Sequence, residues 1–461
     1  MGQLRKRIFR FFSEKRSQSL SATRIIALTF VGIILLGALL LTLPVASRSG
    51  QSHGFLTALF TATSATCVTG LVMGDTFSLW SGFGQVVIIC LIQIGGLGFM
   101  SIATIVVFTL RRKVGLKQRM VMAQALSLND MAGVVRLQKL VLIGSLSIEA
   151  VGALILTLRF LPQYGFTTAL KWGVFHAISA FCNAGFDIFG AVKTPNSSLV
   201  EMNSDPVVLL TLAMLVIIGG LGFLVWEEVV TKRRFKKFSV YTKLVLVTTG
   251  VLLAVGTAMI ALLEWNNPNT IGNMPLGDKL LNCFFQSVTT RTAGFASVDQ
   301  ALLTDGGKGT TIMLMLIGGS SGSTAGGAKT VTVMVLLLFL WATARGKGSV
   351  RAFKRTIPQE QVMNAMTIVA ILVGFAVIGA VVICATSPVG FTDALYEAVS
   401  ALATVGTTAG ATGKLSVAAK ILIIIYMYFG RVGVLTISLG FLMGNKAEER
   451  FQYAPTNLLI G

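Results

Sequence analysis

The sequence predicts an all-α polytopic membrane protein made of four parallel helix–pore loop–helix repeats. Eight spanning helices and four re-entrant pore helices would surround a pseudo-fourfold central pore. Three observations predict this fold: the chain is apolar along its whole length, its basic residues cluster at the ends of apolar segments, and two short glycine patterns recur four times in register. The first two observations place the chain in a lipid bilayer, and the third defines the repeat.

The composition excludes a water-soluble globule. Of the 461 residues, 54% are hydrophobic and only 12% are charged, which leaves too little polar surface to face water. Uncharged runs long enough to cross the ~30 Å hydrocarbon layer as helices occupy residues 25–44, 83–110, 206–226, 244–263 and 361–386. Because the first run has the full length of a span, we interpret it as a working helix and not as a cleaved signal peptide.

The positive charge of +20 is concentrated in a few places. Of the 38 Lys and Arg residues, 27 lie in segments 5–24, 111–139, 232–243, 345–355 and 446–450. These segments alternate with less basic connections, which is the asymmetry of the positive-inside rule. We therefore expect a multi-pass protein of the cell membrane, here a bacterial plasma membrane, with both termini cytoplasmic. The placement at segment ends argues against nucleic acid as a partner, since that would need an interleaved basic and aromatic patch.

Two glycine patterns define an internal repeat. The first pattern reads SATCVTGL at 64–71, SAFCNAGF at 179–186, VTTRTAGF at 288–295 and LATVGTTAG at 402–410. The second reads IGGLGF from Ile94 and from Ile218, IGGSSG from Ile317 and FGRVGV from Phe429. The glycines that the four copies of the first pattern share, Gly70, Gly185, Gly294 and Gly406, are 115, 109 and 112 residues apart. From each of them to the first glycine of the second pattern the separations are 25, 34, 24 and 24 residues. Matched spacing in four copies indicates one structural unit repeated along the chain.

The repeats divide the chain into six parts. They are a basic cytoplasmic N-terminus (1–24), repeat 1 (25–113), repeat 2 (134–234), repeat 3 (240–345), repeat 4 (361–445) and a cytoplasmic tail (446–461). Residues 54–69 would form a helix of only about 24 Å, so we expect a segment that enters the membrane and returns. Non-helical backbone at that depth must be buried or line water. Each repeat begins and ends at a basic cluster, so the repeats are parallel.

Four parallel loops can bring backbone carbonyls to one axis, where they replace the hydration shell of a cation. The fourth copy contains the TVG of potassium-channel filters, and glycine reaches the positive φ that such a loop requires. The predicted K⁺ selectivity filter, in which backbone carbonyls hold the ion, comprises Val68, Thr69, Gly70, Asn183, Ala184, Gly185, Thr292, Ala293, Gly294, Thr404, Val405 and Gly406. A bulky residue follows the glycine in three copies, whereas Thr407 follows it in the fourth, which predicts looser packing there.

Over essentially its whole length the chain resembles the membrane subunits of the Ktr/Trk/HKT superfamily of potassium transporters, most of all the KtrB type. The motifs that carry the resemblance are the filter loops, QSVTTRTAGF at 286–295, GGSSGSTAGGAKT at 318–330, FGRVGVLT at 429–436 and ERFQYAP at 449–455. The resemblance implies K⁺ uptake by a homodimer with one pore per subunit and gating by a cytosolic nucleotide-binding RCK (KtrA-like) ring. It also implies Na⁺ as a candidate coupling ion and no covalent cofactor.

The resemblance further implies an intramembrane gate. A run of small residues should break the second long helix of repeat 3, and in the family such a loop is the gate. The predicted gate comprises Gly318, Gly319, Ser320, Ser321, Gly322, Ser323, Thr324, Ala325, Gly326, Gly327, Lys329 and Arg431. Arg431 would oppose passing cations, or alternatively bond backbone carbonyls or Glu149. Arg291 is expected to brace its filter loop and not to touch the ion.

Other classes of protein fit less well. A phosphate-binding loop at 322–330 is disfavoured because Ala328 separates the last glycine from Lys329. His53 and His176 have no partners at metal-ligand spacing, and no nucleophile with a base is apparent, so we predict no enzyme. A secondary carrier would show inverted repeats and two broken helices, whereas this chain shows parallel repeats and one markedly broken helix. The energetics of a channel or a carrier, and coupling to Na⁺ or H⁺, stay open.

Overall fold

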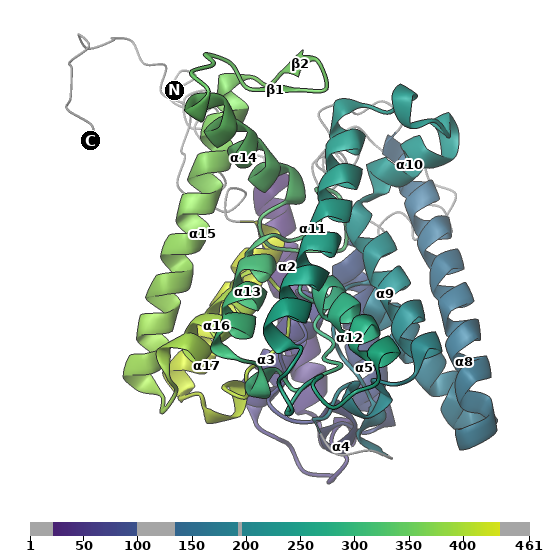
Figure 1. Cartoon of the computed structure of the whole chain (residues 1–461). Helices are drawn as coiled ribbons and strands as arrows, with labels where there is room; N and C mark the ends of the chain where they lie inside the picture. The colour runs from purple at the N-terminus through teal and green to yellow at the C-terminus, as the bar shows by residue number, and fades with distance from the viewer. Residues whose placement is uncertain (1–21, 99–133, 192–195, 434–461) are drawn as a thin grey trace, which may run out of the picture.

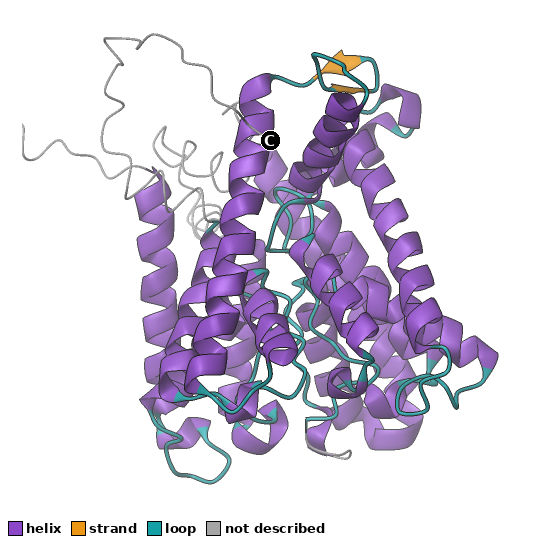
Figure 2. Cartoon of the chain, turned by 60° about the vertical axis from the view of Figure 1, so that its left-hand side comes forward, coloured by secondary structure: helices purple, strands orange, loops and turns teal. Residues whose placement is uncertain are grey.

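The computed structural model describes residues 22–98, 134–191 and 196–433, and it is predominantly helical (Figure 1). Long helices lie side by side, and shorter helices and loops are enclosed among them (Figure 2). The predicted tail (446–461), nearly all of the predicted N-terminus (1–24), and the ends of repeats 1 and 4 beyond residues 98 and 433 lie outside the described residues.

The elements follow the predicted order of long helix, short helix and second helix. The first group is α2 (Ala22–Thr42), η1 (Pro44–Ala46), α3 (Phe55–Thr66), α4 (Thr76–Leu79) and α5 (Gly82–Leu97). The second is α8 (Val134–Phe181), η2 (Phe189–Ala191), η3 (Val200–Met202), α9 (Pro206–Leu221) and α10 (Phe223–Lys232). The third is η4 (Phe235–Lys237), α11 (Val240–Glu264), α12 (Leu276–Thr289), η5 (Gln300–Leu302), α13 (Asp305–Leu316) and α14 (Thr330–Ala344). The last is the hairpin β1 (Arg351–Ala352) and β2 (Arg355–Thr356), α15 (Gln359–Thr386), α16 (Phe391–Leu402), η6 (Thr412–Lys414) and α17 (Val417–Val432).

Within the described residues, four helices are long and apolar enough to cross a membrane, namely α2, α8, α11 and α15. The bent pair of α9 and α10 would be a fifth span. Helices α5 and α17 end close to the limits of the described residues. Eight spanning helices therefore stay a prediction, although the membrane character of the chain agrees with these apolar helices.

The short helices are buried among the long ones. Helices α3 and α16 have 12 residues each and α12 has 14, too few to cross ~30 Å of hydrocarbon. The fourth short helix is the last part of α8, set off from the long part by Gly165, whose φ of 74° breaks the helix. Each short helix ends directly before one of the four predicted filter segments.

The second helices are interrupted more widely than the sequence analysis predicted. Only one helix was expected to be markedly broken. That expectation is wrong, because α9 ends at Leu221, the next residue Gly222 has a φ of 92°, and α10 continues at an angle of 94°. Residues with a Cβ atom rarely adopt a positive φ, so the helix turns where the pattern places this glycine. The predicted break in repeat 3 is confirmed between α13 and α14.

Two large hydrophobic clusters, accompanied by smaller ones, hold the described parts of the repeats together. One lies mainly between the first two groups of helices and includes Ile88, Phe181 and Leu212. The other joins the fourth group to the first through residues such as Phe60 and Ile423. Burying such side chains in both cores fixes the four short helices around a common centre.

Candidate functional site

The structure brings the four predicted filter glycines together. A Cβ atom added to Gly70 would lie 3.2 Å from the Cα of Gly185 and 3.3 Å from the Cα of Gly406. The same atom on Gly185 would lie 2.7 Å from the Cα of Gly294, and on Gly294 it would lie 2.6 Å from the carbonyl oxygen of Val405. The glycines therefore form a closed ring in chain order. They have φ values of 99°, 68°, 85° and 97°, so no other residue fits without strain and collision.

Backbone carbonyls form part of this ring. The carbonyl oxygen of the residue before each glycine lies against the glycine of a neighbouring repeat; these oxygens belong to Thr69, Ala184, Ala293 and Val405. The residue two positions before each glycine also has a positive φ, of 57° at Val68, 57° at Asn183, 66° at Thr292 and 52° at Thr404. Such a backbone is costly for residues with side chains, and it persists only where the surroundings impose it. Because the same unusual φ occurs at the equivalent position of all four repeats, the surrounding structure imposes one backbone conformation on the four loops.

Hydroxyl groups at the ends of the short helices support the ring, and the sequence analysis missed them. Ser64 accepts from the Gly70 amide at 3.1 Å, and Ser400 accepts from the Gly406 amide at 3.0 Å. Ser179 donates to the Phe186 carbonyl at 2.7 Å, and Thr289 donates to the Phe295 carbonyl at 2.5 Å. A serine six residues before the glycine recurs in three copies of the first pattern, which was the available signal.

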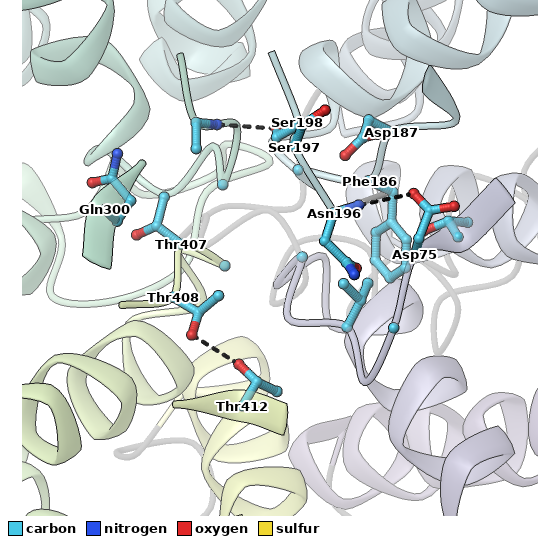
Figure 3. Close-up of a pocket in the computed structure, with 18 of the residues that line it drawn as sticks. Asp75, Phe186, Asp187, Asn196, Ser197, Ser198, Gln300, Thr407, Thr408 and Thr412 are labelled. Atoms are coloured by element: carbon cyan, nitrogen blue, oxygen red, sulfur yellow. Dashed lines mark hydrogen bonds between the residues drawn. The ribbon is translucent and has the colours of Figure 1, made fainter. Parts of the chain in front are cut away.

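A cavity of about 600 Å³ opens on one side of the glycine ring. All four glycines line it, together with four carboxylates, those of Asp75, Asp187, Glu201 and Asp299. Figure 3 shows Asp75, Asp187 and Asn196 on one side of this cavity, opposite Gln300 and Thr407. These carboxylates make the mouth of the ring acidic, which favours cations. Desolvation, and then the neighbouring Asp75 carboxylate, raise the pKa of Asp187 to about 7, so this one carboxyl is partly neutral near neutral pH.

The predicted gate residues 318–327 and 329 form a folded loop, residues 317–329, between α13 and α14. The Gly318 amide donates to the Ala328 carbonyl at 2.8 Å, and the Ser320 hydroxyl donates to the Gly220 carbonyl at 3.1 Å. Lys329 Nζ donates to the Ala325 carbonyl at 2.8 Å. The loop thus has defined internal bonds and is attached to the second helix of repeat 2.

Arg431 connects the fourth repeat to the first repeat and to the loop. Its guanidinium donates to the carbonyls of Gly95, Gly96 and Thr324, with 3.0 Å to Gly96. It therefore bonds backbone carbonyls, as in the second of the two predicted roles. The alternative partner Glu149 instead accepts from Gln93 Nε2 at 3.0 and 3.1 Å. The barrier role of Arg431 stays a prediction.

Two further expectations concern the filter surroundings. Arg291 is only 8% exposed, and its Nη2 donates to Thr330 Oγ1 at 3.3 Å, at the end of the loop. This contact fits the predicted bracing role.

The looser packing expected behind Thr407 is wrong, because the Thr407 hydroxyl bonds the Tyr396 hydroxyl at 3.0 Å and the residue is only 2% exposed. A hydrogen bond replaces the bulk that the other repeats have at this position.

The chain is similar to known proteins over nearly its whole length. A family model described as TrkH, cation transport protein, matches residues 11–452. The chain is 39% identical to the potassium/sodium uptake protein NtpJ of Enterococcus hirae, over 96% of this chain and 98% of that protein. It is 40% identical to the Ktr system potassium uptake protein B of Bacillus subtilis, over 93% and 94%.

The fold is similar to the crystal structure of the potassium transporter TrkH from Vibrio parahaemolyticus, with a TM-score of 0.71 and 17% identity. That match covers 92% of this chain and 85% of the other. The resemblance stated from the sequence motifs is thus confirmed, as is the prediction that the chain is not an enzyme, since the family transports cations. On the evidence of the family match and of two relatives near 40% identity, the chain belongs to the TrkH family of cation transport proteins.

Proposed function

We propose that this protein takes up K⁺ across the cell membrane through a pore on the axis of four parallel repeats. The observation that carries the proposal is the closed ring of Gly70, Gly185, Gly294 and Gly406 with a carbonyl oxygen against each glycine. Carbonyl rings of this kind replace the water around a dehydrating K⁺ ion. The names of the relatives, which include potassium uptake and potassium/sodium uptake, support K⁺ as the ion.

The selectivity filter in this proposal consists of the three residues that end at each glycine. A cation would collect in the acidic cavity and lose water to the carbonyls of residues 68–70, 183–185, 292–294 and 404–406. The ring of positive φ values supports this role, because it lets successive carbonyls face one axis. The cavity would be extracellular, since the basic segments at α10 and at the hairpin lie at the opposite end of the molecule (Figure 1).

The loop of residues 317–329 and Arg431 would form the gate beneath the filter. The Arg431 guanidinium donates a hydrogen bond to the Thr324 carbonyl of the loop, which supports the proposal that the two form one barrier. We extend the proposal to a homodimer regulated by a cytosolic nucleotide-binding RCK ring, with both termini cytoplasmic. These points rest on the resemblance to the Ktr branch. Na⁺ is the candidate coupling ion, and one relative carries sodium in its name.

A flux assay tests the proposal. The purified protein is reconstituted in liposomes that contain K⁺, and Rb⁺ uptake is measured with K⁺ or Na⁺ as the external competitor. We expect K⁺ to suppress Rb⁺ uptake at concentrations where Na⁺ does not. Equal suppression by the two ions, or uptake no greater than that of empty liposomes, would contradict it. Adding Na⁺ at a low concentration in the same assay tests whether K⁺ uptake is coupled to Na⁺. Coupling would appear as a faster uptake of Rb⁺.

A further inference from the structure

We propose that Thr324 of the loop is a positioning residue for ion selectivity, because it holds Asn183 of the second filter segment in place. The loop that gates the pore would then also set the geometry of the filter. This inference rests on the proposed function, in which residues 183–185 belong to the filter and residues 317–329 to the gate.

The amide of Asn183 is held from two sides. Its Oδ1 lies 3.0 Å from Thr324 Oγ1, which is also 3.2 Å from the Phe181 carbonyl oxygen. Its Nδ2 donates to the carbonyl of Arg291, the residue directly before the third filter segment, at 3.3 Å. Thr324 and Asn183 are each only 1% exposed, so water does not replace the Thr324 hydroxyl as a partner of the amide.

Thr324 is itself fixed at its backbone. Its amide donates to the Gly219 carbonyl at 3.3 Å, and its carbonyl accepts from the Arg431 guanidinium. The hydroxyl therefore has a defined position from which to direct the Asn183 side chain. A loop that moves away to open the pore must break this bond.

The fourth filter segment contacts the loop differently. A Cβ atom on Gly326 would lie 3.1 Å from the Cβ of Thr404, and one on Gly327 would lie 3.3 Å from the Cβ of Ala403. Thr404 Oγ1 has no hydrogen-bond partner among the described residues. Among the described residues, the loop thus touches the filter segment of repeat 4 by packing alone, whereas it bonds the filter segment of repeat 2 through the Thr324 hydroxyl.

The bond matters because Asn183 has a φ of 57°. A non-glycine residue keeps such a backbone only where its surroundings impose it. When the hydroxyl is lost, Asn183 can relax, and the neighbouring Ala184 carbonyl, which lies against Gly70, moves with it. The K⁺ preference of the pore therefore depends on the position of the loop.

The test compares two substitutions at one position. Thr324→Val keeps the shape of the side chain and removes the hydroxyl, whereas Thr324→Ser keeps the hydroxyl. The readout is the ratio of K⁺ to Na⁺ inhibition of Rb⁺ uptake in liposomes. We expect the Thr324→Val variant to have a ratio about fivefold lower than the parent protein, because this factor corresponds to the loss of one net hydrogen bond. The Thr324→Ser variant should retain the ratio of the parent protein. Thr324→Ala replaces the Val variant if that protein does not assemble.

Ser323→Ala is the matched control, because among the described residues the Ser323 hydroxyl bonds the Ser320 carbonyl and the Ala325 amide, both within the loop. It is expected to alter the flux without altering the ratio. A Val variant with changed flux and the parent ratio would overturn the inference, provided that Gly185→Ser lowers the ratio in the same assay. If Gly185→Ser also leaves the ratio unchanged, the filter assignment itself fails.

Discussion

Arg431 places a positive charge beside the proposed gate loop, at the Thr324 carbonyl. No ion pair joins it to another described residue, and its hydrogen bonds go to backbone carbonyls. Those carbonyls hold the guanidinium in place without cancelling its charge. The position therefore suits a barrier that slows cations and is attached to the loop.

We expect Arg431→Ala to speed Rb⁺ uptake. A unit charge at ~8 Å from the axis, with an effective dielectric constant of ~20, repels K⁺ by about 2 kcal/mol. That energy corresponds to roughly thirtyfold in rate where this barrier limits the flux. Arg431→Lys should stay slow because it keeps the charge, and both variants should keep the parent ion preference. Equal uptake by the Ala variant and the parent, at matched protein density, would make Arg431 purely structural.

Asp187 should make uptake depend on external pH. Its carboxyl, half-buried near Asp75, has its pKa raised to about 7 by desolvation and by the Asp75 carboxylate. The nearby His176 Nε2 accepts from the Ile188 amide. Below pH 7 the carboxyl is neutral, and above pH 7 it adds a negative charge at the mouth of the pore. At ~10 Å in water this charge attracts a cation enough for about a twofold rise in uptake at low K⁺.

The measurement is initial Rb⁺ uptake between pH 6 and pH 8 outside the liposomes. The control is Asp187→Asn, which should stay at the low level throughout. A parent protein with no step near pH 7, or an Asn variant with the same step, would remove Asp187 from this role.

The sequence predicted some of these residues and not others. The four glycines and Arg431 could be found because they depart from an apolar repeat in a fixed register. The contacts of Thr324 with Asn183 and with Arg431 could not be predicted, because they join residues 141 and 107 positions apart. Such contacts depend on how the repeats pack and not on any local pattern.

At the scale of elements, the loop between α13 and α14 is the interruption that the run of small residues predicted. The bend between α9 and α10 was missed, although Gly222 occupies the same place in its pattern as Gly98 and Gly433, whose φ values are 80° and 92°. An apolar run gives no indication of where a helix turns. Only the recurrence of this third glycine in the second pattern carried the signal.

A short deletion tests the loop as a gate. Removing residues 320–323 shortens the loop and takes away the Ser320 bond to the Gly220 carbonyl, so we expect Rb⁺ uptake to increase several-fold in protein reconstituted alone. Ser349→Ala is the control, because Ser349 lies in the connection before β1 and its half-buried hydroxyl accepts from the exposed Arg351 Nε at 3.1 Å; this variant should leave uptake unchanged. Reduced uptake by a deletion variant that still assembles would make the loop a scaffold for the filter.

At the scale of the molecule, the four glycine loops converge on one point, as the repeat predicted. The broken second helices weaken one argument used against a carrier, since more than one helix is interrupted. The order of the glycine ring still favours a pore, because neighbours in the chain are neighbours in space. Two halves that rock around a midplane site would not require a closed ring of carbonyls.

The most direct test of the central claim is the ion preference of Gly185→Ser and Gly294→Ser in liposomes. A Cβ atom at either position collides with the backbone of a neighbouring filter segment, so the carbonyl ring must open. The account predicts that both variants reach the membrane in parent amounts and that K⁺ loses most of its advantage over Na⁺ as a competitor of Rb⁺ uptake. An unchanged ratio of K⁺ to Na⁺ competition in both variants would contradict the assignment of the glycine ring as the selectivity filter.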